Sequence, residues 1–212
     1  MKEKKNEEYY PYIKNWFKKE SRFYHIFVDI PSKRLRNKIV NIVNARGNSK
    51  ILDVATGTGG QAFAFAKRGY DVVGIDLSED MVKVASGLNK YENLKFRVAD
   101  ATNLPFEDNY FDISSISLAL HDMPLAIREK ALKEMSRVTN PKGIITIFDY
   151  GLPKNKILRY LVYYLVKSHE TKYYPEFIKS NLKPLLRKHG IKVEKEIPIL
   201  GFGKFLKCLN DK

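Results

Sequence analysis

Residues 51–60, Ile-Leu-Asp-Val-Ala-Thr-Gly-Thr-Gly-Gly, constrain the fold more than any other segment of this chain. Three apolar residues surround Asp53, a composition typical of a strand that is buried on both faces. Gly57 and Gly59 follow as a turn in which the backbone can approach a ligand closely, and a helical pattern comes next. A strand, a glycine turn and a helix N-terminus in this order predict a nucleotide-type pocket at the carboxyl end of a parallel sheet.

The same segment also satisfies the dinucleotide pattern G-x-G-x-x-A from Gly57 to Ala62. A pyrophosphate is bound by bare backbone amides and a helix dipole, and a carboxylate beside it would repel it. Asp53 is expected at the strand end, four residues before Gly57, where it favours a cation. S-adenosylmethionine has no phosphate but carries an ammonium and a sulfonium group. The acidic strand end therefore favours this methyl donor, with NAD or NADP as the alternative.

Two further carboxylates follow at the ends of the next two expected strands. Residues 70–76 predict a strand ending in Asp76, whose carboxylate can accept both ribose hydroxyls. The third strand ends just before Asp100, which can accept a hydrogen bond from the adenine amine, while Leu77 and Met81 can cover the ring faces. Each acidic residue alone is also typical of a helix cap or a solvated turn. Three of them in register after a glycine turn indicate one shared ligand.

The motifs around these carboxylates are specific as a set. They are Asp53-Val-Ala-Thr-Gly-Thr-Gly59, Gly74-Ile-Asp76-Leu-Ser, Met81, Asp100-Ala-Thr-Asn-Leu-Pro-Phe106 and Phe111-Asp112. Together they resemble the class I S-adenosylmethionine-dependent methyltransferases, and most nearly the branch that contains the ubiquinone and menaquinone C-methyltransferases. The resemblance runs from about residue 23 onward and is strongest over 50–150. One departure is Gly60, since that branch usually has an acidic residue at this position.

The resemblance implies both the fold and the roles of the site residues. The fold would be α/β, a Rossmann-like three-layer sandwich whose mostly parallel, seven-stranded sheet ends in an antiparallel C-terminal hairpin strand. Asp53 and the glycine loop would hold the methionine part of the donor, Asp76 the ribose, and Asp100 with Ala101 the adenine. S-adenosyl-L-homocysteine would be the product. The expected donor-binding residues are Asp53, Ala55, Thr56, Gly57, Thr58, Gly59, Asp76, Leu77, Met81, Asp100, Ala101, Thr102 and Leu118.

Three regions are expected to form one methyltransferase domain over residues 1–212. Residues 1–48 are basic and aromatic and predict an N-terminal helical cap. Residues 49–150 alternate strand and helix patterns, which predicts the cofactor-binding core. Residues 151–212 predict substrate-cap helices, one of them from Pro175 to His189, and the C-terminal hairpin.

An expected helix at residues 156–167 carries apolar side chains on nearly all sides. Such a helix is usually part of a core. Alternatively, one of its faces lines a hydrophobic substrate cavity or rests on a membrane, with basic residues toward the lipid phosphates. Those basic residues are Lys154, Lys156, Arg159 and Lys167.

The fourth strand end should open beside the donor methyl group, and His121 and Asp122 follow it directly. His121 can accept a proton from a substrate hydroxyl, amine or acidic carbon, because imidazole titrates near neutrality. Asp122 can orient it; alternatively, His121 caps the next helix or only shapes the pocket. Positioning the acceptor and the methyl group in line can also suffice without a strong base. Tyr24, His121 and Tyr150 are the candidates for contact with the acceptor.

Composition bears on partners and compartment. Lys and Arg number 38 against 24 Asp and Glu, and this net charge of +14 suits nucleic acid, an anionic membrane, an acidic substrate or a solvated surface. The basic residues are spread along the chain, which disfavours nucleic acid. A single cysteine, Cys208, and an N-terminus without an apolar stretch favour the cytoplasm. No His/Cys cluster has metal-ligand spacing, so we expect no metal.

The sequence therefore predicts an S-adenosylmethionine-dependent methyltransferase that transfers a methyl group in line to a small-molecule or lipid-like acceptor. Two other classes stay open at this point. A nucleic-acid (RNA) methyltransferase or binder would use the basic surface and would lose binding steeply as salt rises. A non-catalytic partner protein would bind the cofactor and transfer nothing.

Overall fold

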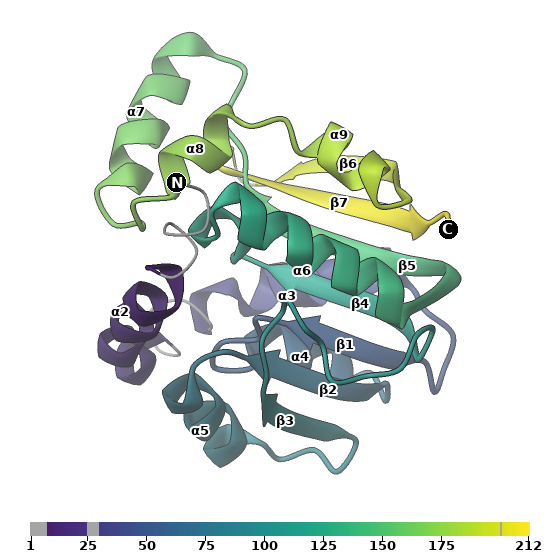
Figure 1. The fold of residues 1–212 in the computed structure, drawn as a ribbon. Coiled ribbons are helices and arrows are strands. Elements are labelled where there is room, and N and C mark those ends of the chain that lie inside the picture. Colours follow the sequence, from purple (N-terminus) through teal and green to yellow (C-terminus); the bar gives the residue numbers. More distant parts are fainter. Residues whose placement is uncertain (1–7, 25–29, 200) are drawn as a thin grey trace.

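A single sheet of seven strands, in the order β3-β2-β1-β4-β5-β7-β6, organises the fold (Figure 1). This computed structural model describes residues 8–24, 30–199 and 201–212, without the side chains of 19–24, 30 and 31. β7 pairs antiparallel with both of its neighbours, and all the other strand pairs are parallel. The predicted mostly parallel sheet with an antiparallel hairpin strand is confirmed. The strands are β1 (Lys50–Val54), β2 (Asp71–Asp76), β3 (Leu94–Val98), β4 (Phe111–Ser117), β5 (Thr139–Tyr150), β6 (Ile191–Ile199) and β7 (Gly203–Asn210).

Helices cover both faces of the sheet, so that the molecule has three layers (Figure 1). Side chains of α3 and α4 form one apolar core with the sheet, and those of α6, α8 and α9 contribute to the other. The neighbouring β1 residues Ile51 and Leu52 belong to different cores, as the alternation of side chains along a strand requires. The helices are α2 (Tyr9–Tyr24), α3 (Ile30–Val43), α4 (Gly60–Ala66), α5 (Glu79–Leu88), α6 (Leu125–Val138), α7 (Lys156–Lys167), α8 (Tyr174–Lys179) and α9 (Leu182–Lys188), with a 3-10 turn η2 (Leu120–Asp122).

The position of each strand follows from its composition. β1 is buried from Ile51 to Val54, because a central parallel strand has a helical layer on each side. The edge strands β3 and β6 instead carry exposed charged side chains, among them Lys95 and Lys192. Charges on an edge strand oppose pairing with another chain.

The predicted helix from Pro175 to His189 is wrong, since the structure has two short helices, α8 and α9, in this segment. Asn181 begins the second helix, because its side chain accepts a hydrogen bond from the Lys183 backbone N–H at 3.1 Å. Pro184 lies in the first turn of α9, where no N–H donor is required. In one continuous helix its ring would clash with the Ser180 carbonyl.

The expectation that α7 is part of the core is also wrong, since none of its residues is buried. Ile157 is 75% exposed and Leu165 is 67% exposed. The aromatic anchor of α7 is Tyr163, whose ring stacks on Tyr174 with 5.9 Å between centroids. Among the described residues, no helix is long and apolar enough to cross a bilayer.

Phe96 on β3 fills the space behind the glycine turn. A Cβ atom at Gly74 would lie 2.7 Å from two atoms of the Phe96 ring and 3.0 Å from Thr56 Oγ1. Gly59, whose φ is +88°, would likewise bring a Cβ atom to 2.7 Å from the ring. Both glycines therefore let Phe96 pack tightly between the sheet and the loop that forms the pocket.

We expect Gly74→Ala to lower the free energy of unfolding by about 1–3 kcal/mol, because the added methyl group overpacks a buried site. Gly87→Ala is the matched control, since nothing lies within 4 Å of a Cβ atom there. Urea unfolding gives both values. If overpacking against Phe96 is the cause, Phe96→Leu will partly restore stability in the Gly74→Ala background, and an additive double mutant will contradict it.

Candidate active site

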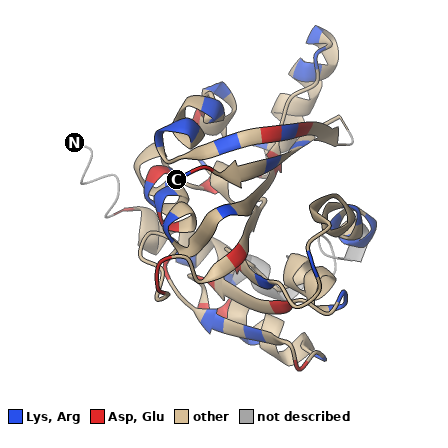
Figure 2. Cartoon of the chain, turned by 90° about the vertical axis from the view of Figure 1, so that its right-hand side faces the viewer, with Lys and Arg blue, Asp and Glu red and all other residues tan. Residues whose placement is uncertain are grey.

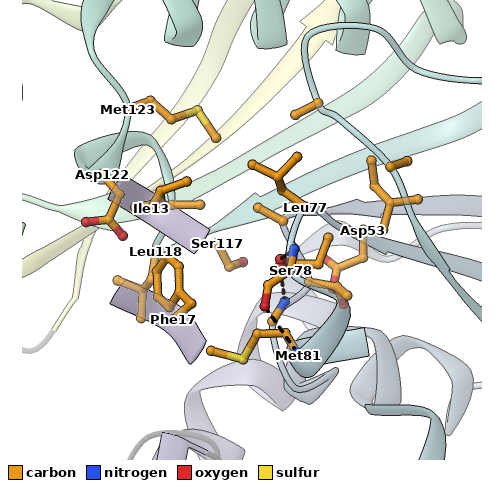
Figure 3. Close-up of a pocket in the computed structure, with 18 of the residues that line it drawn as sticks. Ile13, Phe17, Asp53, Leu77, Ser78, Met81, Ser117, Leu118, Asp122 and Met123 are labelled. Atoms are coloured by element: carbon orange, nitrogen blue, oxygen red, sulfur yellow. Dashed lines mark hydrogen bonds between the residues drawn. The ribbon is translucent and has the colours of Figure 1, made fainter. Parts of the chain in front are cut away.

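A cavity lies at the carboxyl ends of β1, β2 and β4, next to α2 (Figure 3). Its empty space is about 930 Å³, part of which is open to solvent. Polar residues near the ends of β1, β2 and β3 and at the start of α4 form one part of the lining. Apolar residues from α2, α6 and the segment between β4 and α6 form another. The polar part includes Asp53, Gln61, Asp76, Ser78 and Asp100, and the apolar part includes Ile13, Phe17, Leu118, Met123 and Ile127.

Asp53 is only 1% exposed, yet it lacks a full set of hydrogen bonds. Its Oδ2 accepts a hydrogen bond from the Thr56 hydroxyl at 2.6 Å, whereas Oδ1 has no partner among the described residues. Burial raises the pKa of Asp53 to about 6, although the Thr56 hydroxyl and the positive charge of Arg36 oppose the rise. Both side-chain amide atoms of Gln61, another lining residue, also lack partners among these residues. A ligand with an ammonium group matches these free acceptors.

Asp76 holds the glycine turn in place from the end of β2. Its Oδ2 accepts a hydrogen bond from the Gly57 N–H at 2.8 Å, and its Oδ1 accepts one from the Ser78 N–H at 2.9 Å. Burial raises the pKa of Asp76, and these amide donors counteract the rise. Each carboxylate oxygen has a further lone pair, which suits a diol such as ribose.

Most of the predicted donor-binding residues line the cavity, and three do not. Thr102 instead connects its loop to α2, with its hydroxyl 3.1 Å from that of Tyr10, while its N–H donates to Asp100 Oδ1. Thr58 is fully buried, and Gly59 caps the N-terminus of α4. The predicted residues that line the cavity are Asp53, Ala55, Thr56, Gly57, Asp76, Leu77, Met81, Asp100, Ala101 and Leu118.

Two residues that line this cavity have a strained backbone conformation. Ala55 and Leu118 each have a φ of 52°, a left-handed conformation that is uncommon for residues with a Cβ atom. Both follow strand ends and both line the cavity. Gly60, the departure from the resembled branch, begins α4 and does not line the cavity.

His121 lies at the centre of a buried group of carboxylates. Its Nδ1 is 2.7 Å from Asp149 Oδ1, and its Nε2 is 3.1 Å from Glu170 Oε2 and 3.4 Å from Asp122 Oδ2. The Tyr150 hydroxyl donates to the other Glu170 oxygen at 2.6 Å. Of the His121 and Asp122 pair, only Asp122 lines the cavity; Tyr150 does not line it either.

The electrostatics of this cluster favour the protonated form of His121 in the free protein. Burial alone would lower the pKa of His121, but the carboxylates of Asp122, Asp149 and Glu170 outweigh it and raise the pKa well above its usual value. Burial raises the pKa of Asp122 to about 6, while the nearby His121 charge lowers it. At neutral pH a carboxylate rather than the imidazole is therefore ready to accept a proton. A catalytic role for His121 stays a prediction.

Sequence reasoning missed Glu170 as a member of this cluster, since it lies 49 residues from His121 and no motif contains it. Ligand-type atoms of His121, Asp122 and Glu170 lie within 4.8 Å of one another. The expectation that the site uses no metal stays a prediction.

Buried Arg128 holds the segment that carries this cluster. Its guanidinium donates to the carbonyl oxygens of Leu120 and Met123 and to the Ser180 hydroxyl. These bonds connect η2 to α6 and to the end of α8. Arg36 of α3 lines the cavity and was likewise not predicted as a site residue.

Helix α2 contributes Tyr9, Ile13 and Phe17 to the cavity lining. The side chain of Tyr24, which the sequence predicted as an acceptor contact, lies outside the described residues. Figure 3 shows Ile13 and Phe17 near Leu118, on the side of the cavity away from Asp53.

The chain matches known proteins along most of its length. Residues 52–147 match a family model described as a methyltransferase domain. A demethylmenaquinone methyltransferase from Paenarthrobacter aurescens is 40% identical over 122 residues, which are 58% of this chain and 47% of that protein. Another, from Staphylococcus saprophyticus, is 31% identical over 159 residues, 73% of this chain and 67% of that protein. The chain belongs to the class I S-adenosylmethionine-dependent methyltransferases.

The donor of this family is S-adenosylmethionine, so the comparisons favour the methyl donor over the dinucleotide alternative. The fold of this chain is that of a SAM-dependent methyltransferase from Aquifex aeolicus, with a TM-score of 0.65 at 21% identity over 82% of this chain and 88% of the other. The match spans only about half the length of the first curated relatives, 47% and 50%.

The buried charge of Asp53 should lower the stability of the free protein while it favours binding of a cationic donor. The folded pKa of about 6 exceeds the usual value of about 3.9 in an unfolded chain, so the native state holds this proton more tightly. The free protein should therefore lose stability as pH rises from about 4 to about 6 and stay less stable above that. We expect Asp53→Asn to raise the free energy of unfolding at pH 7.5 by about 1–3 kcal/mol, with only about a third of that gain at pH 4.5.

Urea unfolding of the donor-free protein at both pH values measures this effect. Asp71→Asn, an exposed carboxyl at the other end of β2, is the control and should change little. A variant that is less stable than the parent at pH 7.5, or equally stabilised at both pH values, would show that burial of the charge is not the cause.

Proposed function

We propose that this methyltransferase transfers the donor methyl group to a small, apolar acceptor with a quinone-type ring. The observation that carries the proposal is the division of one cavity into a polar half at the ends of β1 and β2 and an apolar half beside Asp122. The polar half suits the donor, and the apolar half suits a hydrophobic ring. The names of the relatives, demethylmenaquinone methyltransferases, support the same acceptor class.

The donor-binding residues divide the ligand among three strand ends. Asp53 and Gln61 would hold its ammonium group, because both have free acceptor atoms at the cavity. Asp76 would accept the ribose hydroxyls, and Asp100 the adenine amine. When bound, the donor supplies an electrophilic methyl group on a sulfonium, which needs little further activation.

The apolar half would orient the acceptor by packing. This region is lined from α2, from α6 and from the segment that joins β4 to α6, by Ile13, Phe17, Leu118, Met123 and Ile127. Holding two reactants in line can contribute about 7–11 kcal/mol to a transfer reaction. A flat ring is well suited to such positioning because it fits between apolar side chains.

Asp122 would accept the proton that the acceptor releases. Asp122 is one of the residues that line the cavity (Figure 3), and its pKa of about 6 keeps it ionised at neutral pH. A ring hydroxyl of the acceptor would give its proton to Asp122 while the neighbouring ring carbon forms the new bond to the methyl group and the methyl–sulfur bond breaks, which leaves S-adenosyl-L-homocysteine. The proton of that ring carbon would then be lost and a proton would return to the ring oxygen, so that the aromatic ring is restored. His121 would act as a positioning residue whose positive charge keeps Asp122 ionised.

An RNA acceptor has less support. Lys and Arg residues lie on many elements rather than along one stripe (Figure 2). The cavity also contains three acidic strand ends and Asp122, which would repel phosphate. RNA is therefore the less well supported class of methyl acceptor.

An acceptor panel tests the proposal directly. Methyl transfer from labelled S-adenosylmethionine should be found with a reduced, short-tailed demethylmenaquinone analogue and should be absent with a transfer RNA transcript. Transfer to the RNA alone would contradict the proposed acceptor class. Donor binding without transfer to any compound would instead favour a non-catalytic partner protein.

The role of Asp122 predicts how activity depends on pH. The base must be ionised, so kcat/KM should rise with pH through an apparent pKa near 6. Asp122→Asn should lower kcat by about 10²–10⁴-fold and leave donor affinity unchanged in calorimetry. His121→Gln removes the neighbouring positive charge and should move the pH profile toward higher pH. Full activity of Asp122→Asn would leave positioning alone as the mechanism.

A further inference from the structure

Helix α7 presents an apolar face to solvent that nothing in the described part of the chain covers. The exposed fractions are 75% for Ile157, 63% for Tyr160, 59% for Leu161 and 67% for Leu165. These residues, with Tyr164, recur at helical spacing and so lie on one side of the helix. Exposed apolar patches of this kind mark a surface that binds something.

The orientation of α7 is set by contacts on its opposite side. The Tyr163 ring stacks on Tyr174, which is fully buried, and Val162 and Val166 are half-buried. Asn155 caps the helix N-terminus by accepting hydrogen bonds from the Ile157 and Leu158 N–H groups. The apolar face is therefore held outward by the fold.

Charge identifies the chemistry of the partner. Lys154 and Lys156 lie at the N-terminal end of the helix and Lys167 at the C-terminal end, and all three are exposed. From residue 154 to residue 169 the sequence has no Asp or Glu. An apolar stripe between cations, without acidic residues, is the pattern of a helix that lies in the plane of an anionic membrane surface. A second copy of α7 on the same face would instead bring lysine against lysine.

The place of α7 in the fold agrees with a surface role. At 12 residues it is about 18 Å long, too short to cross a bilayer but long enough to lie on one. Figure 1 shows α7 and α2 on the same side of the molecule, toward the carboxyl ends of the parallel strands where the cavity lies. A bilayer against α7 would thus lie on the side of the active site.

We infer that α7 docks this methyltransferase on the surface of an anionic lipid bilayer. Ile157, Leu161 and Leu165 insert among the acyl chains at the boundary, and Lys154, Lys156 and Lys167 contact the lipid phosphates. This binding does not depend on which acceptor is methylated, because the face is formed by the fold alone.

Co-sedimentation with lipid vesicles tests the inference. The protein should sediment with vesicles of phosphatidylglycerol mixed equally with phosphatidylcholine, and much less with phosphatidylcholine alone. Leu161→Glu combined with Leu165→Glu should reduce partitioning at least about tenfold, because two carboxylates replace inserted side chains on an anionic surface. Leu88→Glu combined with Leu125→Glu is the matched control, since both are exposed apolar residues outside α7.

Two further measurements make the outcome decisive. Unchanged S-adenosylhomocysteine binding in the α7 variant would show that its fold and pocket are intact, and Lys154, Lys156 and Lys167 changed together to Gln should also weaken sedimentation. Equal binding of the parent and the α7 variant, or no binding of the parent to anionic vesicles, would overturn the inference. So would a dimer in analytical ultracentrifugation that the α7 variant abolishes without any vesicle binding by the parent, because a second copy would then cover the face.

Discussion

The cavity is built around a buried carboxylate, Asp53, that lacks a complete set of hydrogen-bond partners. Asp53 is 1% exposed near the end of the interior strand β1, and one of its oxygens has no hydrogen bond among the described residues. Such a group destabilises the free protein unless a cation satisfies it. The ionised Asp53 lowers the stability of the free protein. A ligand whose ammonium group pairs with it removes this destabilisation, and the free energy recovered adds to the affinity for the ligand.

The rest of the structure makes that affinity specific. Asp76 places the glycine turn through backbone hydrogen bonds, and Phe96 fits behind the turn only because Gly59 and Gly74 lack side chains. On the other side of the cavity, Arg128 holds the segment that brings Asp122 to the cavity. One sheet edge thus combines a polar site for the donor with an apolar site for the acceptor, and α2 lies beside both.

The parts of the fold that depend on local patterns could be predicted from the sequence, and those that depend on distant contacts could not. Strand ends at Asp53, Asp76 and Asp100 follow from apolar runs and glycine positions close by. The link from His121 to Glu170 forms only because α7 and α8 return the chain to η2, so no local pattern contains it. The exposure of α7 could not be predicted, because its apolar residues occur on all sides of the helix. Such a pattern does not show which side packs against the rest of the protein. The break before α9 had a signal, Asn181 followed by Pro184, which the helical periodicity concealed.

Proton release on donor binding tests the central claim most directly. At pH 6 about half of Asp53 is protonated in the free protein, and an ammonium group beside it should drive that proton off. Calorimetry of S-adenosylmethionine binding at pH 6, in buffers of different ionisation enthalpy, should therefore give a release of about half a proton per site. In Asp53→Asn that release should disappear. Equal proton release by the parent and the variant, or proton uptake by the parent, would contradict the claim that the buried carboxylate is the group that the donor satisfies.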